Sequence, residues 1–297
     1  MTLLTRRRFG LSVGLCGLLL LAVLLVSPGV GPRPPGVVEA WRSIGADDDP
    51  GHYYYIAFQM RWPRALKALL AGVTLSLCGA VFQTLFRNPL ATPYTLGIAS
   101  GGSLGAMLAI ELGLTGTLLW VSPVMLCAFA GSAAVVVAVA FLARAARGLS
   151  SNGLLLGGVT IGFFCSALML FTQYLADERD AFEIIRWMMG SVATVGYGEL
   201  LALAPFVVIP WLVLCSRARA LDQYAMGAEL AATRGVSPGR LQAWCIAMAS
   251  VATAAIVSSC GPIGFVGLIV PHAARRMVGA DHRVSLIVSG LLGGTFL

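Results

Sequence analysis

The sequence predicts an all-α, polytopic membrane protein, and two observations predict it: the composition and the recurring apolar runs. Of the 297 residues, 58% are hydrophobic and only 11% are charged, and the mean hydropathy is +0.86. Soluble domains carry roughly 25% charged residues. A surface this poor in charge cannot be hydrated, which excludes a soluble enzyme and a disordered chain. We therefore expect a single transmembrane domain over residues 1–297.

Nine apolar stretches follow one another along the chain. Seven approach or exceed the roughly 20 residues that a helix needs to cross a bilayer. They are 9–27, 65–86, 93–113, 118–143, 154–176, 199–215 and 241–260. Two shorter stretches follow, and we count the first, 263–274, as a tilted or broken span. The second, 284–297, stops without a polar anchor, so we expect a chain truncated within a span, with a short re-entrant terminus as the alternative.

Charged residues alternate between successive connections. If the amino terminus is cytoplasmic, the acidic segments 47–49 and 177–180 lie outside and most arginines lie inside, as the positive-inside rule requires. The arginines placed inside are Arg6, Arg7, Arg8, Arg87, Arg144, Arg147, Arg217, Arg219, Arg234, Arg240, Arg275, Arg276 and Arg283. The net charge of +7 is thus explained by topology, and we expect no nucleic-acid partner.

Two connections are long enough to carry recognition. The outer one, about 28–60, is rich in proline and glycine. In the inner one, about 217–240, residues 225–234 are strong helix formers, and Gly235 and Pro238 supply a stop. A helix there suits docking into a groove of another protein, although an ordinary connecting helix fits the pattern equally well.

The spans offer little chemistry of their own. Glu111 and Glu199 lie at span ends, and the span centres lack charged residues, which disfavours an ion-coupled carrier. The chain has no H-E-x-x-H motif and no Walker A loop, so energy from ATP must come from a partner. The three histidines are too few and too far apart for a metal site, and the seven cysteines form no C-x-x-C pair.

A glycine-rich run at 97–103 keeps one enzymatic alternative open. Ser100 in this run could serve a membrane-embedded serine hydrolase. The small residues have a simpler use, because Gly101 and Gly105 form a G-x-x-x-G pattern that predicts close helix contact.

Two proline-containing breaks interrupt the apolar pattern, one in each half of the chain. Residues 88–93 read N-P-L-A-T-P, and residues 261–272 begin with G-P and end with P-H. Non-helical backbone at membrane depth is tolerated where protein or a water-filled cavity satisfies its polar groups. Paired breaks of this kind favour a transporter built from repeats.

The sequence contains three longer motifs, and the two breaks belong to the first and the third of them. The first reads R-W-P-R at 61–64, followed by Gly72, Gly79, Gln83 and R-N-P-L-A-T-P at 87–93. The second reads W-M-M-G-S at 187–191, and the third reads G-P-I-G-F-V-G-L-I-V-P-H at 261–272, with Arg275 and G-A-D-H-R at 279–283. In this order and spacing the motifs resemble the ABC-importer permeases for iron-siderophores, haem and cobalamin.

The resemblance implies a type II ABC-importer permease with ten helices, of which this chain would hold about nine, in the bacterial cytoplasmic membrane. It also implies a second permease copy or sister permease, ABC ATPase subunits below it and an extracytoplasmic substrate-binding protein above it. We expect ATP-driven import of a metal chelate, a ferric siderophore, with cobalamin or haem as alternatives. The chain itself would be a transport subunit, not an enzyme. A membrane-embedded hydrolase or an ion-coupled carrier remains as an alternative of another class.

The resemblance also implies residue roles. Arg61 and Arg64 match the outer arginines that pair with carboxylates of the binding protein. Positions that narrow the inner mouth of the pathway match Asn88, Leu90, Ser151 and Asn152. The segment 222–240 matches the coupling helices that rest on the ATPase, including Met226, Gly227, Ala228 and Glu229.

Overall fold

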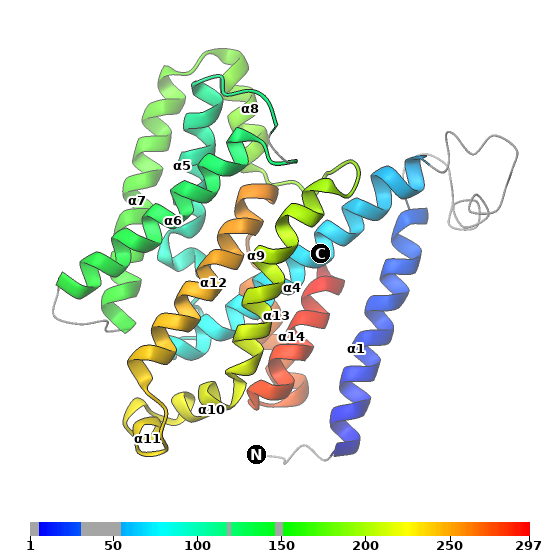
Figure 1. Cartoon of the computed structure of the whole chain (residues 1–297), viewed down its shortest axis with the longest axis vertical. Coiled ribbons are helices and arrows are strands. Elements are labelled where there is room, and N and C mark those ends of the chain that lie inside the picture. The colour runs from blue at the N-terminus through cyan, green and yellow to red at the C-terminus, as the bar shows by residue number, and fades with distance from the viewer. Residues whose placement is uncertain (1–5, 31–54, 118–119, 146–150) are drawn as a thin grey trace, which may run out of the picture.

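The computed structural model describes residues 6–30, 55–117, 120–145 and 151–297, and every element in these ranges is helical (Figure 1). The predicted all-α class is confirmed. The short helical turns are η1 (Ser27–Gly29), the π-helix η2 (Tyr55–Arg61) and η3 (Pro93–Leu96). The α-helices are α1 (Arg6–Val26), α4 (Trp62–Leu85), α5 (Ile98–Glu111), α6 (Pro123–Ala145), α7 (Ser151–Leu175), α8 (Glu178–Met188), α9 (Gly198–Ser216), α10 (Ala218–Met226), α11 (Ala228–Thr233), α12 (Pro238–Cys260), α13 (Val266–Val278) and α14 (His282–Phe296).

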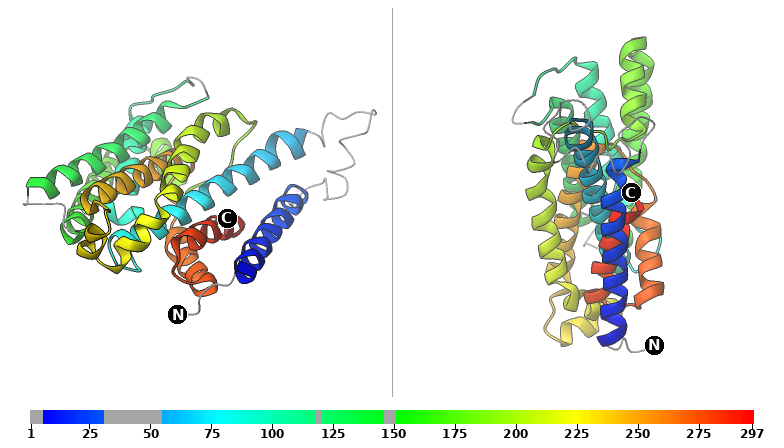
Figure 2. Two further views of the ribbon diagram at one scale, coloured as in Figure 1. Left: turned by 60° about the horizontal axis from the view of Figure 1, so that its bottom comes forward. Right: turned by 90° about the vertical axis from the view of Figure 1, so that its right-hand side faces the viewer.

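Two helices form the centre of the bundle. In the spans that contain α4 and α12, 72% and 61% of the most apolar window is buried, whereas in α1 only 6% is buried. Accordingly, α1 lies at one edge, against α14, and α5 to α8 form a group on the opposite side (Figures 1 and 2). The helices α10 and α11 lie at one end of the bundle, which we call the α11 end, and α8 lies at the other, the α8 end.

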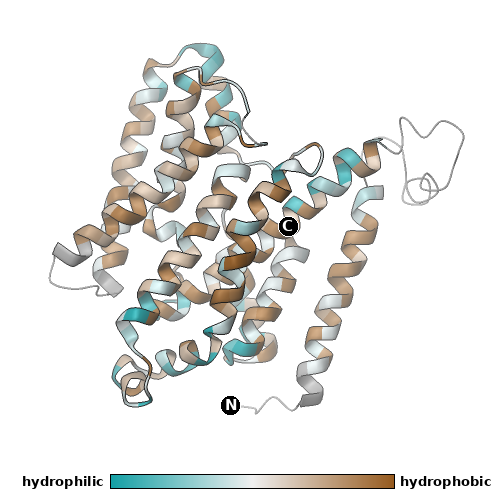
Figure 3. Cartoon of the chain, in the orientation of Figure 1, coloured by the Kyte–Doolittle hydropathy of each residue, from teal (hydrophilic) through white to brown (hydrophobic). Residues whose placement is uncertain are grey.

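Six helical segments in the described ranges are long and apolar enough to cross a membrane. They are Gly10–Gly29, Tyr55–Leu85, Pro123–Leu142, Gly153–Leu175, Gly198–Ser216 and Pro238–Cys260. Apolar residues dominate these helices, and hydrophilic residues gather near the two ends of the bundle (Figure 3). One further apolar helix, α5, has only 14 residues, and α13 and α14 have 13 and 15 residues. The count of nine spans therefore stays a prediction.

Three local predictions were wrong. The acidic segment that begins at Asp177 is not simply a loop, because α8 starts at Glu178, where Glu178 and Asp180 complement the positive end of the helix dipole. The outer connection ends early, because helical backbone already begins at Tyr55. The predicted helix 225–234 is divided into α10 and α11 at Gly227, whose φ of 146° suits only glycine.

The same inner connection also corrects the role of a proline. Gly235, at φ 82°, does follow the end of α11, as predicted. Pro238, however, opens α12 at a position where its missing N–H costs nothing, so it starts a helix instead of stopping one. The acidic residues at 47–49 and Arg147 lie outside the described residues.

Close glycine contacts hold the bundle together. A side chain at Gly101 would meet Val135 Cγ2 at 2.5 Å and the Gly131 carbonyl at 2.6 Å, and one at Gly105 would overlap the Cys127 carbonyl. The predicted use of this G-x-x-x-G pattern is confirmed, since it brings α5 against α6. On the other side of the bundle, Gly72 contacts Gly293 of α14 in the same way.

Candidate functional site

The two predicted helix breaks meet inside the bundle. The hydroxyl of Tyr94, in η3 directly after the first break, donates to the carbonyl of Ile263 at 2.7 Å and accepts from the Ile263 N–H at 3.0 Å. The helices that follow the breaks, α5 and α13, have 14 and 13 residues. At 1.5 Å per residue they are about 20 Å long, so each is shorter than the bilayer core. The backbone polar groups of the second break are thus satisfied in part by a side chain that follows the first.

The W-M-M-G-S segment contributes a third break at the same place. Helix α8 ends at Met188, and the Ser191 N–H then donates to the Cys260 carbonyl at 2.7 Å. Gly190 and Gly261 face each other with φ values of 73° and 71°, and a side chain at Gly261 would lie 2.6 Å from the Trp187 carbonyl. Only glycine combines this backbone conformation with so close an approach.

A cavity of about 220 Å³ lies between the first two breaks. Its lining includes Leu90, Thr92, Tyr94, Ile263, Gly264 and Phe265. Phe265 has a φ of 65°, which is unusual for a residue with a side chain, and this side chain is 73% exposed. Strained backbone is found preferentially at functional positions, and no feature of the sequence predicts it at Phe265.

Polar contacts also join α4 to α13 beside this cavity. The Gln83 side-chain amide donates to the Leu268 carbonyl at 3.2 Å, and its oxygen accepts from the guanidinium of Arg275. Both residues belong to the motifs of the sequence. Their contact shows that the first and third motifs pack directly against each other inside the bundle.

A second cavity, of about 520 Å³, opens beside α8 and holds a buried ion pair. Lys67 Nζ, on a side chain only 2% exposed, lies 2.7 Å from Glu199 Oε1 and also donates to the carbonyls of Ala193 and Ser259. Thr194 Oγ1 donates to the other Glu199 oxygen at 2.9 Å. The sequence analysis placed Glu199 at a span end but missed its partner, because the two residues are 132 positions apart.

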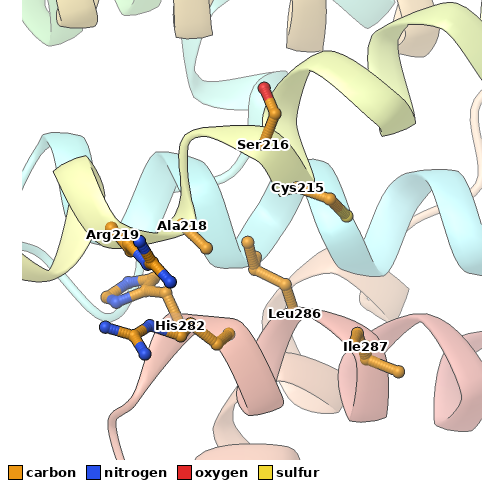
Figure 4. Close-up of a pocket in the computed structure, with 8 residues that line it drawn as sticks. Cys215, Ser216, Ala218, Arg219, His282, Leu286 and Ile287 are labelled. Atoms are coloured by element: carbon orange, nitrogen blue, oxygen red, sulfur yellow. The ribbon is translucent and has the colours of Figure 1, made fainter.

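A third cavity, of about 290 Å³, lies at the α11 end between α9, α10 and α14 (Figure 4). Figure 4 shows His282 and Arg219 on one side of it and the apolar Leu286 and Ile287 on the other. Asp222 lies next to His282, with its Oδ1 2.6 Å from the ring Nδ1. Burial alone raises the pKa of the Asp222 carboxyl, but hydrogen bonds from His282 and the positive charges of His282 and Arg283 outweigh it, so the pKa lies below its usual value of 3.8.

The predicted docking arginines lie at the start of α4. Arg61 is half-buried, and its Nη1 donates to the Pro28 carbonyl at 2.9 Å, whereas Arg64 is exposed. Helical backbone already precedes Arg64, because the π-helix η2 ends at Arg61 and continues directly into α4. Their role in docking stays a prediction.

The predicted inner-mouth residues are only partly brought together. Asn88 Oδ1 accepts from the Leu90 N–H at 2.9 Å, and Leu90 is 68% exposed. Ser151 and Asn152 begin α7, and their side chains lie outside what the structure describes. The same helix packs on the first break further along, since a side chain at Gly158 would lie 2.5 Å from the Thr95 carbonyl.

The predicted coupling residues lie together at the α11 end. Met226 ends α10, Gly227 makes the turn, and Ala228 and Glu229 begin α11. Met226 and Glu229 are exposed, as contact with a partner requires. This placement is compatible with contact to an ATPase, and the coupling role stays a prediction.

In the described residues, apolar spans and broken helices that line a cavity form the architecture of a polytopic membrane transport protein. The chain belongs to the FecCD transport family, which residues 19–297 match. This is the family of ABC-importer permeases that the motifs indicated.

Relatives and a solved structure are similar over most of the chain. The permease YvrB of an ABC transporter of Bacillus subtilis is 36% identical, over 86% of this chain and 72% of that protein. The cobalamin import system permease BtuC of Halobacterium salinarum is 34% identical, over 95% and 85% of the two chains, and a vitamin B12 import system permease BtuC of Escherichia coli is 35% identical, over 94% and 82%. A structure described as an inward-facing conformation of a metal-chelate type ABC transporter matches with a TM-score of 0.84 and 30% identity, over 96% and 87% of the two chains.

Proposed function

We propose that this chain is the membrane-spanning subunit of an ATP-driven importer of a metal chelate in the bacterial inner membrane. The observation that carries the proposal is the convergence of three helix breaks around Tyr94, Ile263 and Gly261. Broken helices supply the non-rigid, cavity-lining backbone that alternating access needs. The cavity of about 220 Å³ between them, with Leu90 and Phe265 exposed, is the part of the pathway that we assign to this subunit.

A second permease, either an identical copy or a sister chain, completes the pathway in this proposal. Helix α7 supports it, because large apolar side chains are exposed along its length. Phe163, Phe171 and Tyr174 are 74%, 61% and 85% exposed. A helix covered by aromatic residues suits contact with a matching helix as well as contact with the lipid bilayer.

The two ends of the bundle would meet different partners. At the α8 end, which we assign to the outside, Arg61 and Arg64 would pair with carboxylates of an extracytoplasmic binding protein. At the α11 end, the turn formed by Met226, Gly227 and Ala228 would rest on an ABC ATPase. The start of α1 lies at this second end in Figure 1, which agrees with a cytoplasmic amino terminus.

The cargo that we propose is a ferric siderophore. Cobalamin is the second candidate, because two of the similar permeases are named for cobalamin or vitamin B12. The exposed lining residues of the described cavity, Leu90 and Phe265, carry no charge, which suits a pathway that must release what enters it.

Reconstitution tests the proposal. The permease is placed in proteoliposomes with its ATPase and binding protein, and uptake of an iron-labelled siderophore and of cobalt-labelled cobalamin is measured with ATP and with a non-hydrolysable analogue. We expect ATP-dependent uptake of the siderophore and none with the analogue. Uptake of cobalamin alone would replace the cargo and keep the mechanism, whereas equal accumulation without hydrolysis would contradict the mechanism.

A further inference from the structure

His282 joins three helices at the α11 end. Its ring, on a residue only 5% exposed, lies between Asp222 of α10 and Thr84 of α4. The Nδ1–Oδ1 and Nε2–Oγ1 distances are both 2.6 Å. Because a carboxylate can only accept, Nδ1–H donates to Asp222, and the His282 backbone N–H donates to the same oxygen at 2.9 Å. Asp222 is thereby held by two donors from the first residue of α14.

A second contact joins α10 to the end of α4. Arg87 Nη2 donates to the Tyr224 carbonyl at 3.1 Å, and its guanidinium lies 5.5 Å from the centre of the Tyr224 ring. Tyr224 is buried, and Arg87 has a φ of 48°, which marks the sharp turn after α4. The next residue, Asn88, begins the segment that leads to the inner mouth.

The two contacts start two residues apart on α10, at Asp222 and Tyr224, and end three residues apart, at Thr84 on α4 and at Arg87 just after this helix. Apolar surfaces can slide over one another at little cost, but hydrogen bonds have a preferred direction and resist sliding. His282, Thr84 and Tyr224 are buried, Asp222 is half-buried and Arg87 is exposed. A displacement of α10 is therefore passed on to the turn at 86–91 instead of being absorbed at the interface. Neither contact involves residues 226–229, which lie at the end of α10 and the start of α11 and of which Met226 and Glu229 are exposed.

We propose that the linkage Asp222–His282–Thr84, together with Arg87–Tyr224, transmits movement of α10 to the inner mouth of the pathway. His282, Asp222 and Thr84 are thus positioning residues for coupling, and they touch neither cargo nor nucleotide. This inference rests on the proposed function, since the force on α10 comes from the ATPase. It assigns a role to the start of α14, to which the sequence analysis gave none.

A pair of variants at Thr84 tests the linkage in the reconstituted transporter. Thr84→Val keeps the shape of the side chain and removes the oxygen that His282 contacts, whereas Thr84→Ser keeps the oxygen. We expect uptake per ATP hydrolysed to fall about tenfold in Thr84→Val and to stay at the wild-type value in Thr84→Ser. Asp222→Asn should lower the ratio as well, and the double variant should be no worse than the worse single one, because both changes interrupt one chain of contacts.

Distance measurements separate this role from a merely structural one. Spin labels at the exposed positions Ala225, on α10, and Leu90, at the inner mouth, are each paired with a label at Leu112 near the α8 end. The two partly exposed cysteines, Cys127 and Cys215, are replaced first. In the wild type we expect ATP binding to shift both distances. In Thr84→Val only the distance from Ala225 should shift.

The outcomes distinguish the two proposals. If α10 moves in Thr84→Val and Leu90 moves with it as in the wild type, the linkage is overturned and the proposed function stands. If the ATPase does not move α10 even in the wild type, the proposed function is overturned and the linkage with it. Equal loss of uptake in Thr84→Ser and Thr84→Val would show that the hydroxyl contact does not contribute to coupling, and it would overturn the linkage.

Discussion

Among single residues, Lys67 shows how far a side chain can differ from what its place in the sequence indicates. It lies in an apolar run near one end of a span, where a lysine normally extends to the interface. Here it is buried and has three oxygen acceptors, one of them a carboxylate. These acceptors come from α9, the end of α12 and the segment before α9, so the ion pair holds that segment against α4.

Removing the lysine should leave a carboxylate without its cation. We expect Lys67→Met to lower the free energy of unfolding by about 3 kcal/mol, the scale measured when one partner of a buried ion pair is deleted. The loss of stability is measured as a shift of the unfolding midpoint in detergent. In the double variant with Glu199→Gln, at least half of the loss should be recovered, because no buried charge is then unpaired. A double variant as unstable as Lys67→Met would show that apolar contacts of the lysine stem, not the charge, matter here.

Asp222 should make stability depend on pH in acid. Its pKa is lowered in the folded protein, so its contribution is present above the unfolded value of 3.8 and is lost as the pH falls through the folded value. We therefore expect the unfolding midpoint of the wild type to fall between about pH 5 and pH 3 more steeply than that of Asp222→Asn. Thermal unfolding in detergent at several pH values measures the difference, and parallel curves would contradict it.

The residues that the sequence identified correctly are those in local motifs. Gly101 and Gly105 lie at the close helix contact that their G-x-x-x-G pattern predicted. Gly190 and Gly261 belong to motifs, but the sequence did not predict that they meet. The pairs Lys67–Glu199 and Asp222–His282 were missed, since their members are 132 and 60 positions apart and only the folded bundle brings them together. No periodicity in one sequence records such a distance.

At the scale of helices, small residues fix the separation of α5 and α6. A methyl group at Gly105 would overlap the Cys127 carbonyl, whereas at Gly157 of α7 the nearest atom, Val139 Cγ1, lies 3.9 Å away. We expect Gly105→Ala to destabilise the protein by about 1–3 kcal/mol through overpacking. The matched control Gly157→Ala should be neutral or stabilising by up to about 1 kcal/mol, because alanine favours a helix. Equal midpoints for the two variants would contradict a tight contact at Gly105.

Helix boundaries followed from the sequence wherever apolar length decided them. The long spans and the first proline-containing break lie where the runs and their interruptions placed them. The second break is shorter than the predicted 261–272, because α13 begins at Val266 and continues through Pro271. The sequence did not predict α8, because the acidic residues at its start also favour a loop. It did not predict the division at Gly227 either, because the residues on both sides favour a helix. In both places the local sequence pattern covers only a few residues, and contacts with the rest of the bundle decide whether the backbone is helical.

For the whole molecule, the arrangement of the three breaks is the feature that sequence alone left open. The two proline-containing breaks were visible in the sequence, and the third segment was visible only as a motif. The convergence of all three depends on Tyr94 reaching Ile263 and on Gly190 meeting Gly261, contacts between distant parts of the chain. The same arrangement separates an acidic helix and two arginines at one end from two short helices at the other (Figure 1). A transporter that connects a delivery protein to a motor needs such a division between its two faces.

The face at the α8 end leads to a prediction about charge. Arg64 is exposed, so Arg64→Glu reverses its charge without breaking a described contact, whereas Arg61→Glu also removes the bond to the Pro28 carbonyl. We expect Arg64→Glu to weaken binding of the loaded binding protein at low salt by about tenfold, and less at high salt, because exposed charges are screened within about 10 Å at 0.1 M salt. Surface plasmon resonance with the permease in nanodiscs measures the affinity. Arg179→Glu, on exposed α8 at the same end, is the matched control, and an equal loss in both variants would show that net charge, not the arginine at position 64, attracts the partner.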